Sequence, residues 1–258
     1  MGHPLLDLTH KTAVVIGGTS GIGLTIAKGL AIAGADVVAT GRRAELVSAA
    51  AGEIQALGRK SLAIPCDVTD SASLERLRDA MLGEFGSVEI LVNSAGRTKR
   101  TATLDFSEPD WNAILDTNLT GALRSCRIFG RSMIERGYGR IVNIASIASF
   151  VGLQEVAAYS ASKAAVASLT KSLAVEWARH GVCVNAIAPG VFRTDLNATL
   201  LDGTERGREF LLRTPIKRFG RLEELVGAAV YLASDAASFT TGHVLVVDGG
   251  MLSSGVNQ

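Results

Sequence analysis

The sequence predicts an α/β fold in which one doubly wound parallel sheet carries helices on both faces. About seven short apolar runs alternate along the chain with longer segments of helical periodicity. Strands that are apolar throughout and alternate with helices are typical of a parallel sheet buried on both faces. Right-handed crossovers then give a Rossmann-like arrangement, which we expect to form a single domain over residues 1–258.

The expected elements follow one another in regular order. The strand-like runs are short and mostly apolar, and they cover residues 13–16, 37–39, 62–64, 90–92, 141–144, 182–187 and 244–247. The helix-patterned segments cover residues 23–33, 44–57, 73–85, 111–137, 159–180 and 223–232. No linker, repeat or low-complexity stretch interrupts this order. The least regular stretch, residues 191–217, falls between a strand and a helix, so we predict a lid over a site there.

The composition limits the classes of protein to which the chain can belong. Of its 258 residues, 47% are hydrophobic and 20% charged, and the net charge of +1 gives no electrostatic reason to bind nucleic acid or an anionic membrane. The cysteines (Cys66, Cys126 and Cys183) and the four histidines lack metal-ligand spacing, so we expect no metal site and buried thiols in a reducing, cytoplasmic setting. No apolar run reaches the ~18 residues of a membrane span, and the N-terminus lacks a signal-peptide pattern.

A glycine-rich turn lies between the first expected strand and the first expected helix. It reads Gly17, Gly18, Thr19, Ser20, Gly21, Ile22 and Gly23. Glycines let backbone N–H groups approach phosphates, and a helix N-terminus favours negative charge. The glycine spacing is GxxxGxG rather than the GxGxxG of many dinucleotide-binding proteins, and such turns also serve tight packing of strand against helix. The position of the turn favours phosphate binding.

The end of the second expected strand indicates which dinucleotide binds. An acidic residue there would accept hydrogen bonds from the adenosine ribose of NAD and repel the phosphate of NADP. This chain instead reads Thr40, Gly41, Arg42 and Arg43. Guanidinium groups suit phosphate through forked, charge-assisted hydrogen bonds, so we predict NADP in preference to NAD. The alternative is a solvated pair of arginines that opens the next helix.

Tyr159 and Lys163 are four residues apart in an expected helix, so their side chains share one face. A lysine ammonium there would favour the phenolate and bring a pKa of ~10 closer to neutral pH. A tyrosine tuned in this way can donate or accept a proton. Ser146, thirteen residues upstream, offers a second donor. The alternatives are a core aromatic residue, a surface lysine and a serine that only ends a strand.

With these features the chain resembles the short-chain dehydrogenase/reductase family over residues 11–250. The matching motifs are the turn at residues 17–23, Asp67 and Val68, the run from Asn93 through Ser94 and Ala95 to Gly96, Asn118, Ser146, Tyr159 with Lys163, and Pro189 with Gly190. Two positions depart from the family pattern: Ile16 replaces a usual threonine, and Ser94 replaces a usual second asparagine. We therefore expect a local repacking where the first and fourth strands meet.

The resemblance implies a catalytic role for four residues. Ser146 would hydrogen-bond the carbonyl oxygen of the substrate, and Tyr159 would pass a proton to that oxygen while hydride arrives from the nicotinamide. Lys163 would hold the nicotinamide ribose and lower the pKa of Tyr159. Asn118 would position a water that links Lys163 to solvent, or else only makes a local side-chain-to-backbone motif.

The resemblance also implies the cofactor contacts. Asp67 and Val68 would lie beside the adenine, although Asp67 could instead only cap the following turn. Further contacts would follow two later strands: Asn93, Ala95 and Gly96 after the fourth, and Pro189, Gly190 and Thr194 after the sixth. Tyr159 and Lys163 would touch the cofactor as well.

The function implied is an NADP(H)-dependent oxidoreductase that interconverts a carbonyl and a secondary alcohol. Three cations after Gly96 (Arg97, Lys99 and Arg100) would suit an anionic substrate, or form a solvated loop. Sugar acids, polyols and 3-oxoacyl groups are the substrate classes suggested by analogy. Family members of this length usually form homotetramers. The alternatives are a catalytically silent nucleotide-binding regulator, which would be expected to lack the tyrosine or the lysine, and a family member that catalyses epimerisation or dehydration.

Overall fold

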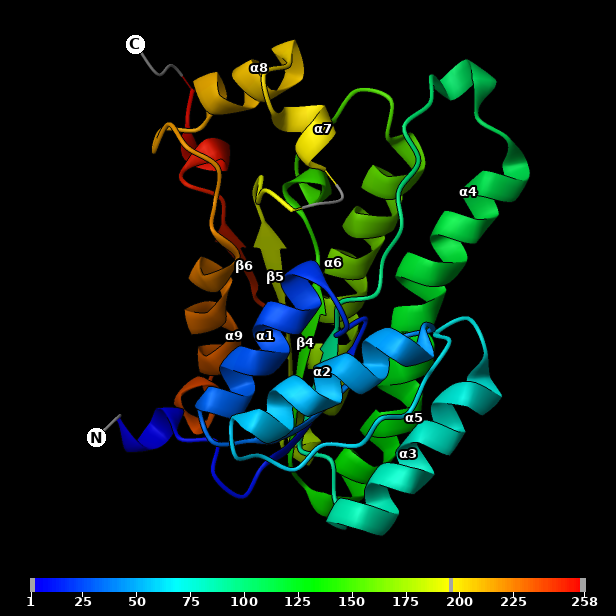
Figure 1. Ribbon diagram of the computed structural model, residues 1–258, viewed down its shortest axis with the longest axis vertical. Helices are drawn as coiled ribbons and strands as arrows, with labels where there is room; N and C mark the ends of the chain where they lie inside the picture. Colours follow the sequence, from blue (N-terminus) through cyan, green and yellow to red (C-terminus); the bar gives the residue numbers. More distant parts are fainter. Residues whose placement is uncertain (1–2, 195–196, 256–258) are drawn as a thin grey trace.

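Six parallel strands form one sheet in the order β2-β1-β3-β4-β5-β6 (Figure 1). The computed structural model describes residues 3–194 and 197–255. The strands are β1 (Thr12–Ile16), β2 (Asp36–Thr40), β3 (Ile90–Asn93), β4 (Gly139–Ile144), β5 (Val182–Pro189) and β6 (Val244–Val247). After β2 the chain crosses to the other side of β1, so the strand order reverses between β1 and β3. In doubly wound sheets, ligands bind at the carboxyl ends of the strands beside such a reversal.

The third of the seven expected strands, residues 62–64, is not formed, so the described residues give six strands. Its segment runs beside the edge strand β2 and makes one backbone hydrogen bond to this region at each end, the first from Val37 N to Lys60 O at 3.1 Å. Between these bonds the carbonyl of Ile64 accepts from a threonine hydroxyl of β2 at 2.5 Å. A side chain thus replaces the backbone ladder in the middle of the segment.

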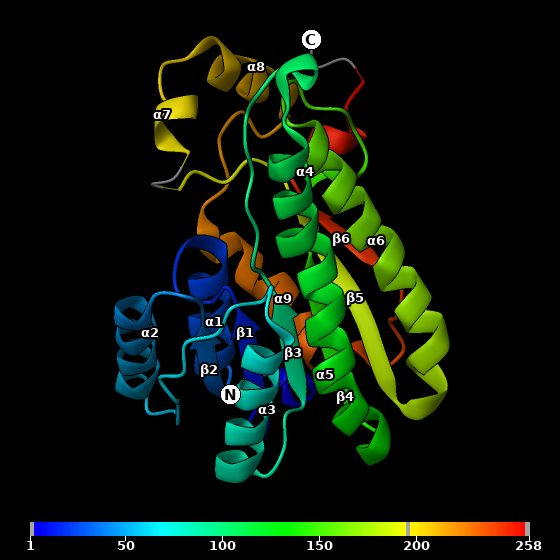
Figure 2. The same cartoon turned by 90° about the vertical axis from the view of Figure 1, so that its right-hand side faces the viewer.

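One face of the sheet is covered by α1 (Gly21–Ile32), α2 (Ala44–Ala56) and α9 (Val226–Ala233). The opposite face is covered by α3 (Ser71–Phe85), α5 (Gly121–Arg136) and α6 (Ala157–Trp177). Figure 2 shows α1 and α2 on one side of the strands and α5 and α6 on the other. The expected α/β architecture with helices on both faces is confirmed.

Each face has its own hydrophobic cluster, to which successive residues of β1 contribute in turn. Ala13 and Val15 belong to the cluster with α1 and α9, whereas Val14 and Ile16 belong to the cluster with α3 and α5. All five residues of β1 are buried. Because side chains alternate across a strand and both faces are covered, an apolar residue is favoured at almost every position.

The single long helix expected over residues 111–137 is divided into two. The chain forms α4 (Glu108–Leu115), a π-helical turn (Asp116–Thr120) and then α5. In the π-helical turn the N–H of Gly121 donates to the carbonyl of Asp116, five residues back. Turns of this kind are rare and often mark functional sites. The helix expected over residues 223–232 likewise begins as a 3₁₀ turn (Leu222–Leu225) before α9.

The segment at residues 191–217, predicted to be irregular, contains two short helices, α7 (Ala198–Leu201) and α8 (Glu205–Arg213). Asp195 and Leu196 of this segment lie outside the described residues. Figure 1 shows α7 and α8 at the end of the molecule toward which the arrow of β5 points. None of the helices in the described part of the chain is both long and apolar enough to span a membrane.

Candidate active site

The glycine-rich turn is packed tightly between β3 and α1. A Cβ atom on Gly17, which has a φ of 77°, would lie 2.5 Å from the backbone N of Ala95, and a Cβ on Gly23 would lie 2.1 Å from the carbonyl O of Gly17. The N–H groups of Gly17 and Gly18 both donate to the Thr40 carbonyl at 2.9 Å. Gly17 and Gly23 are therefore required for packing, as the alternative interpretation of this turn holds.

Gly21 differs from its two neighbours in the motif because the space beside it is open. A Cβ on Gly21 would have only the methyl group of Thr194 within 4 Å, at 3.8 Å, and the φ of Gly21 is 50°. The side chain of Ser20, at the N-cap of α1, makes no capping hydrogen bond in the described structure. Ile22 packs against the core below. The first N–H groups of α1 are thus available to an anion in this space, which Thr194 borders.

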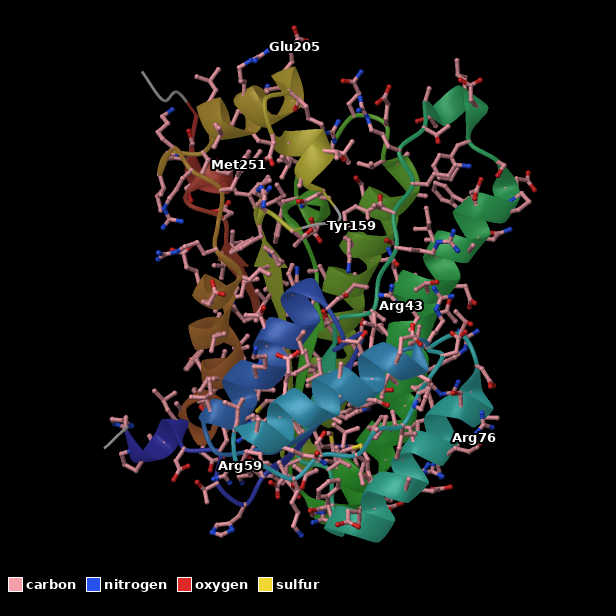
Figure 3. All side chains as sticks on the ribbon, viewed as in Figure 1. Arg43, Arg59, Arg76, Tyr159, Glu205 and Met251 are labelled. Carbon is pink, nitrogen blue, oxygen red and sulfur yellow. The ribbon has the colours of Figure 1, made fainter. Side chains whose placement is uncertain are left out.

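The end of β2 lies against the glycine-rich turn and is followed by two exposed cations. A Cβ on Gly41 would lie 3.1 Å from the hydroxyl oxygen of Thr19, so the two segments are in close contact. Arg42 and Arg43 are both exposed, and Arg43 occupies the N-cap of α2 without a side-chain capping bond in the described structure. Figure 3 labels Arg43 at the start of α2, lower in the view than Tyr159.

Asp67 has a structural role of its own. One of its carboxylate oxygens accepts from the N–H of Thr69 at 2.9 Å and from the Thr69 hydroxyl at 2.7 Å. Burial raises the pKa of Asp67, but these hydrogen bonds, with the nearby charges of Arg42 and Arg124, outweigh burial and lower the pKa overall. Asp67 therefore does cap the following turn, and its charge lies within electrostatic reach of Arg42.

Ser146 and Tyr159 converge beyond the carboxyl end of β4. Ser146 caps a short 3₁₀ turn (Ile147–Ser149), and its hydroxyl oxygen accepts from the N–H of Ala148 at 3.1 Å. Tyr159 lies in the first turn of α6. Burial raises the pKa of Tyr159, and a hydrogen bond with Ser146 acts in the opposite direction. The two hydroxyl groups are therefore close neighbours, and Ser146 favours the ionised form of the phenol.

Lys163 lies one turn further along α6, beneath Tyr159, and is 5% exposed. Its Nζ donates to the carbonyl of Ile144 at 2.6 Å and lies 5.7 Å from the centre of the Tyr159 ring. Burial lowers the pKa of Lys163 to about 8. Contrary to the expectation from the sequence, the pKa of Tyr159 is raised in this structure, because burial outweighs the other influences on the phenol.

Asn118 lies in the π-helical turn and is 2% exposed. Its side chain accepts from the N–H of Arg97 at 2.8 Å and donates to the Arg97 carbonyl and to the Ser162 hydroxyl, each at 3.0 Å. The contacts are long-range, so the alternative of a local motif is wrong. The Asn118 side chain thus connects the loop after β3 to α6, and its oxygen already accepts a hydrogen bond from Arg97.

The other predicted positions lie at the ends of β3 and β5. Asn93 and Val68 are buried at 7% exposure each, whereas Gly96 is exposed and a Cβ there would lie 3.8 Å from Lys163 Nζ. Pro189 ends β5, and a Cβ on Gly190 would lie 2.6 Å from the backbone of Asp248. Gly190 is therefore needed for close packing, and the side chains of Asn93 and Val68 face inward.

Two of the three cations in the loop after β3 are paired with acidic side chains. Lys99 contacts Asp110 and Arg100 contacts Glu155, each at 2.5 Å. Glu155 has a φ of 64°, which is uncommon outside glycine. Neither pair was predicted from the sequence, because the partners come from other segments and no local pattern joins them. The net positive charge of this loop is consequently smaller than its sequence indicates.

The glycine-rich turn at the strand reversal, the buried Ser146 and Lys163 and the half-buried Tyr159 are the features typical of a nucleotide-dependent oxidoreductase. A family model described as enoyl-(acyl carrier protein) reductase matches residues 17–252, and the chain belongs to the short-chain dehydrogenase/reductase family.

Several relatives in this family match nearly the whole chain. Gluconate 5-dehydrogenase of Gluconobacter oxydans is 42% identical, covering 97% of this chain and 98% of the relative. A 2-dehydro-3-deoxy-D-gluconate 5-dehydrogenase of Bacillus subtilis is 43% identical, with 97% and 98% coverage. Among solved structures, a gluconate 5-dehydrogenase of Burkholderia cenocepacia in complex with NADP and tartrate matches with a TM-score of 0.94 at 38% identity, covering 97% of this chain and 98% of that one.

Proposed function

We propose that this protein is an NADP(H)-dependent oxidoreductase that interconverts a carbonyl and a secondary alcohol of a sugar acid. The observation that carries the proposal is the group formed by the buried Ser146 and Lys163 with the half-buried Tyr159 at the carboxyl end of β4. The tyrosine and the lysine that a catalytically silent regulator would be expected to lack are both present. The named relatives are dehydrogenases of gluconate and of a related sugar acid.

The residues of the chain account for the proton chemistry. Reduction of a ketone builds negative charge on its oxygen, and donors aimed at that oxygen can be worth several kcal/mol. Ser146 and Tyr159 present two adjacent hydroxyl groups for this purpose. Ser146 accepts from Ala148 N, so its own hydrogen, which acts on Tyr159 in this structure, can turn to the substrate oxygen. Tyr159 acts as the acid in reduction and as the base in oxidation, with Lys163 below it.

The turn at the strand reversal fits a dinucleotide phosphate. The open space at Gly21 and the free N–H groups of α1 suit a pyrophosphate, and the exposed Arg42 and Arg43 suit the additional phosphate of NADP. When bound, this cofactor supplies or accepts the hydride. Thr19, Ser20, Ala95, Gly96 and Thr194 would also hold the cofactor in place. The solved structure of the Burkholderia cenocepacia relative contains NADP.

The substrate test measures the oxidation of NADPH with a panel of keto sugar acids, ketoses (the oxidised forms of polyols) and 3-oxoacyl thioesters. We expect the highest kcat/KM with a keto sugar acid. Replacing Tyr159 by phenylalanine should lower that kcat/KM by at least ~100-fold, because the proton donor is lost. Tyr138→Phe is the matched control: Tyr138 bonds to Asp235 outside this site, so activity should stay near that of the wild type. Full activity of Tyr159→Phe would overturn the mechanism.

The remaining properties follow from the same proposal. The chain forms a single domain, and the segment over residues 191–217 acts as its lid, supported by the bidentate ion pair of Arg193 with Asp202, which braces α7. We assign the protein to the cytoplasm because its three cysteines are buried and unpaired. A homotetramer is supported by apolar surface at β6 and α6, considered below.

A further inference from the structure

A chain of buried polar side chains crosses the second face of the sheet from α6 to β3. The hydroxyl of Thr170 donates to the carbonyl of Val166 at 2.8 Å. The amide nitrogen of Asn143 donates to the Thr170 hydroxyl at 3.0 Å, and the amide nitrogen of Asn93 donates to the side-chain oxygen of Asn143 at 2.9 Å. Asn93 and Asn143 are register partners on β3 and β4. The apolar strand pattern is therefore interrupted by two polar residues that meet each other.

The direction of this chain determines how the Asn93 amide is oriented. A carbonyl can only accept, so Thr170 must donate to Val166 and is left to accept from the nitrogen of Asn143. The oxygen of Asn143 then faces Asn93, which must present its own nitrogen. The Oδ1 atom of Asn93 is consequently the free end of the chain. It is shielded from solvent, and no donor in the described part of the protein reaches it.

A buried amide oxygen without a donor costs about 1–3 kcal/mol, so a partner is expected for it. Asn93 lines a small cavity of about 10 Å³ together with Thr117, Asn118 and Lys163, and with apolar side chains that include Val68 and Val166. This volume is about the smallest that holds one water molecule. The cavity lies between the end of β3, the π-helical turn and α6.

Lys163 is the donor that this cavity offers. An ammonium has three hydrogens, and only one is used by the Ile144 carbonyl. The oxygen of Asn118 already accepts from Arg97, whereas Asn93 Oδ1 is a cavity-lining oxygen without any donor among the described residues. Among the described residues, the titratable side chain that faces Lys163 is Tyr159, on the same helix. No charged group of β3, β4 or the π-helical turn acts on Lys163 there, and its pKa is lowered by burial.

We propose that one water molecule is bound in this cavity, where it accepts from Lys163 Nζ and donates to Asn93 Oδ1, so that Asn93 is a positioning residue for the reaction. The proposal rests on the proposed function for its catalytic meaning. Asn93 supports the ammonium of Lys163 through the water, and the positive charge of Lys163 in turn favours the phenolate of Tyr159. Asn93 thus acts from beneath the site rather than by touching the cofactor.

The direct test is a high-resolution crystal structure of the full-length wild-type protein. We expect an ordered water within hydrogen-bonding distance of both Asn93 Oδ1 and Lys163 Nζ. A cavity that is empty, or a water bonded to neither atom, overturns the proposal. This result does not depend on activity, whereas a wild-type protein inactive on the whole substrate panel would count against the proposed function alone.

The kinetic test compares two variants that break the same buried chain at different ends. Asn93→Ala removes the acceptor of the water, and Thr170→Val removes the far end without touching the cavity. For Asn93→Ala we expect the rising limb of kcat/KM for alcohol oxidation to move to higher pH by about one unit, because the phenolate loses support. Thr170→Val should lower the melting temperature and leave the limb in place.

A conservative variant separates positioning from packing. Asn93→Asp retains an acceptor at the same place, so its rising limb should not move to higher pH. Equal shifts in Asn93→Ala and Thr170→Val, or no shift in either, would show that Asn93 has only a structural role. Should Asn93→Ala fail to fold, the wild-type crystal structure still decides.

Discussion

At the scale of single residues, burial is the strongest influence on the site. Lys163 has its ammonium inside the protein, 2.6 Å from the Ile144 carbonyl, and burial lowers its pKa to about 8. The same surroundings raise the pKa of Tyr159. The fold therefore moves the two pKa values apart, so that the lysine has the lower pKa of the pair. Below pH 8 the lysine is charged, and its positive charge can then favour the phenolate of Tyr159.

The lowered pKa of Lys163 predicts a pH dependence of stability. Between pH 8 and about 10.4, the ordinary value for lysine, the unfolded chain binds a proton that the folded chain does not. Stability therefore rises with pH in that window, and burial costs about 3 kcal/mol below it. In urea unfolding, the free energy of unfolding of the wild type should therefore rise by about 3 kcal/mol from pH 8 to about 10.4, relative to that of Lys163→Met. Parallel pH curves for the two proteins would contradict this.

Arg42 is expected to determine the choice of cofactor. Its exposed guanidinium lies at the end of β2, and its charge reaches Asp67. Arg42→Ala should lower the ratio of kcat/KM for NADPH to that for NADH by roughly 10- to 100-fold, because a charge-assisted hydrogen bond is lost. Arg76→Ala is the control, since Arg76 is an exposed arginine on α3, away from β2. An unchanged ratio in Arg42→Ala would refute the assignment.

At the scale of elements, the turn after β1 shows how the chain tolerates an unusual residue. Ile16 is 2% exposed and belongs to the second hydrophobic cluster. The tie between this turn and β3 is a backbone hydrogen bond, from Ser94 N to the Ile16 carbonyl at 2.8 Å. Any residue can supply that carbonyl. The expected repacking therefore concerns the side chain alone, and the backbone connection is retained.

This arrangement predicts that Ile16→Thr affects stability more than turnover. A buried hydroxyl without a partner should lower the free energy of unfolding by about 1–3 kcal/mol, measured by urea titration, with kcat close to the wild-type value. Val14→Thr, on the same strand and in the same cluster, should lose a similar amount. A large fall in kcat for Ile16→Thr at unchanged stability would be the opposite result.

The division of the long helix is the second lesson at this scale. The π-helical turn brings Asn118 to the point where α6 and the loop after β3 meet. An uninterrupted helix would direct the following residues differently. Helical periodicity predicted residues 111–137 as one helix because α4, the π-helical turn and α5 follow one another without a break, and the turn carries no Gly or Pro signal of its own.

At the scale of the whole molecule, apolar side chains are exposed at β6, before it at Phe239, and on α6. β6 is an edge strand of four partly exposed apolar residues. Val175 on α6 is 83% exposed, and Phe239 is fully exposed. Exposed edges and large apolar side chains of this kind are usually covered by another subunit.

We therefore expect a homotetramer in solution. Light scattering should give a mass close to four chains for the wild type. Val175→Asp should lower that mass, because a charge is costly to bury in an interface. Ile32→Asp is the matched control: Ile32 is 73% exposed on α1, on the opposite face of the sheet, and its replacement should leave the mass unchanged. A monomeric wild type would exclude the assembly.

The sequence alone determined the fold class, the glycine-rich turn and the serine, tyrosine and lysine of the site. These are local signals: apolar runs, helical spacing and motifs that lie within one or two elements. The strand expected over residues 62–64 does not form because a threonine hydroxyl of β2, and not a backbone amide, donates to the carbonyl of Ile64. The pattern of apolar residues does not reveal whether a side chain or the backbone donates this hydrogen bond.

Only the tertiary structure decided which charged and polar groups are already engaged in ion pairs and hydrogen bonds within the protein. Lys99 pairs with Asp110 on α4, Arg100 pairs with Glu155 before α6, and Asn118 bonds to Arg97 in the loop after β3. The orientation of the Asn93 amide follows from contacts on three separate elements. Such pairings depend on distances between segments far apart in the chain, because folding alone brings them within hydrogen-bonding range and removes competing water.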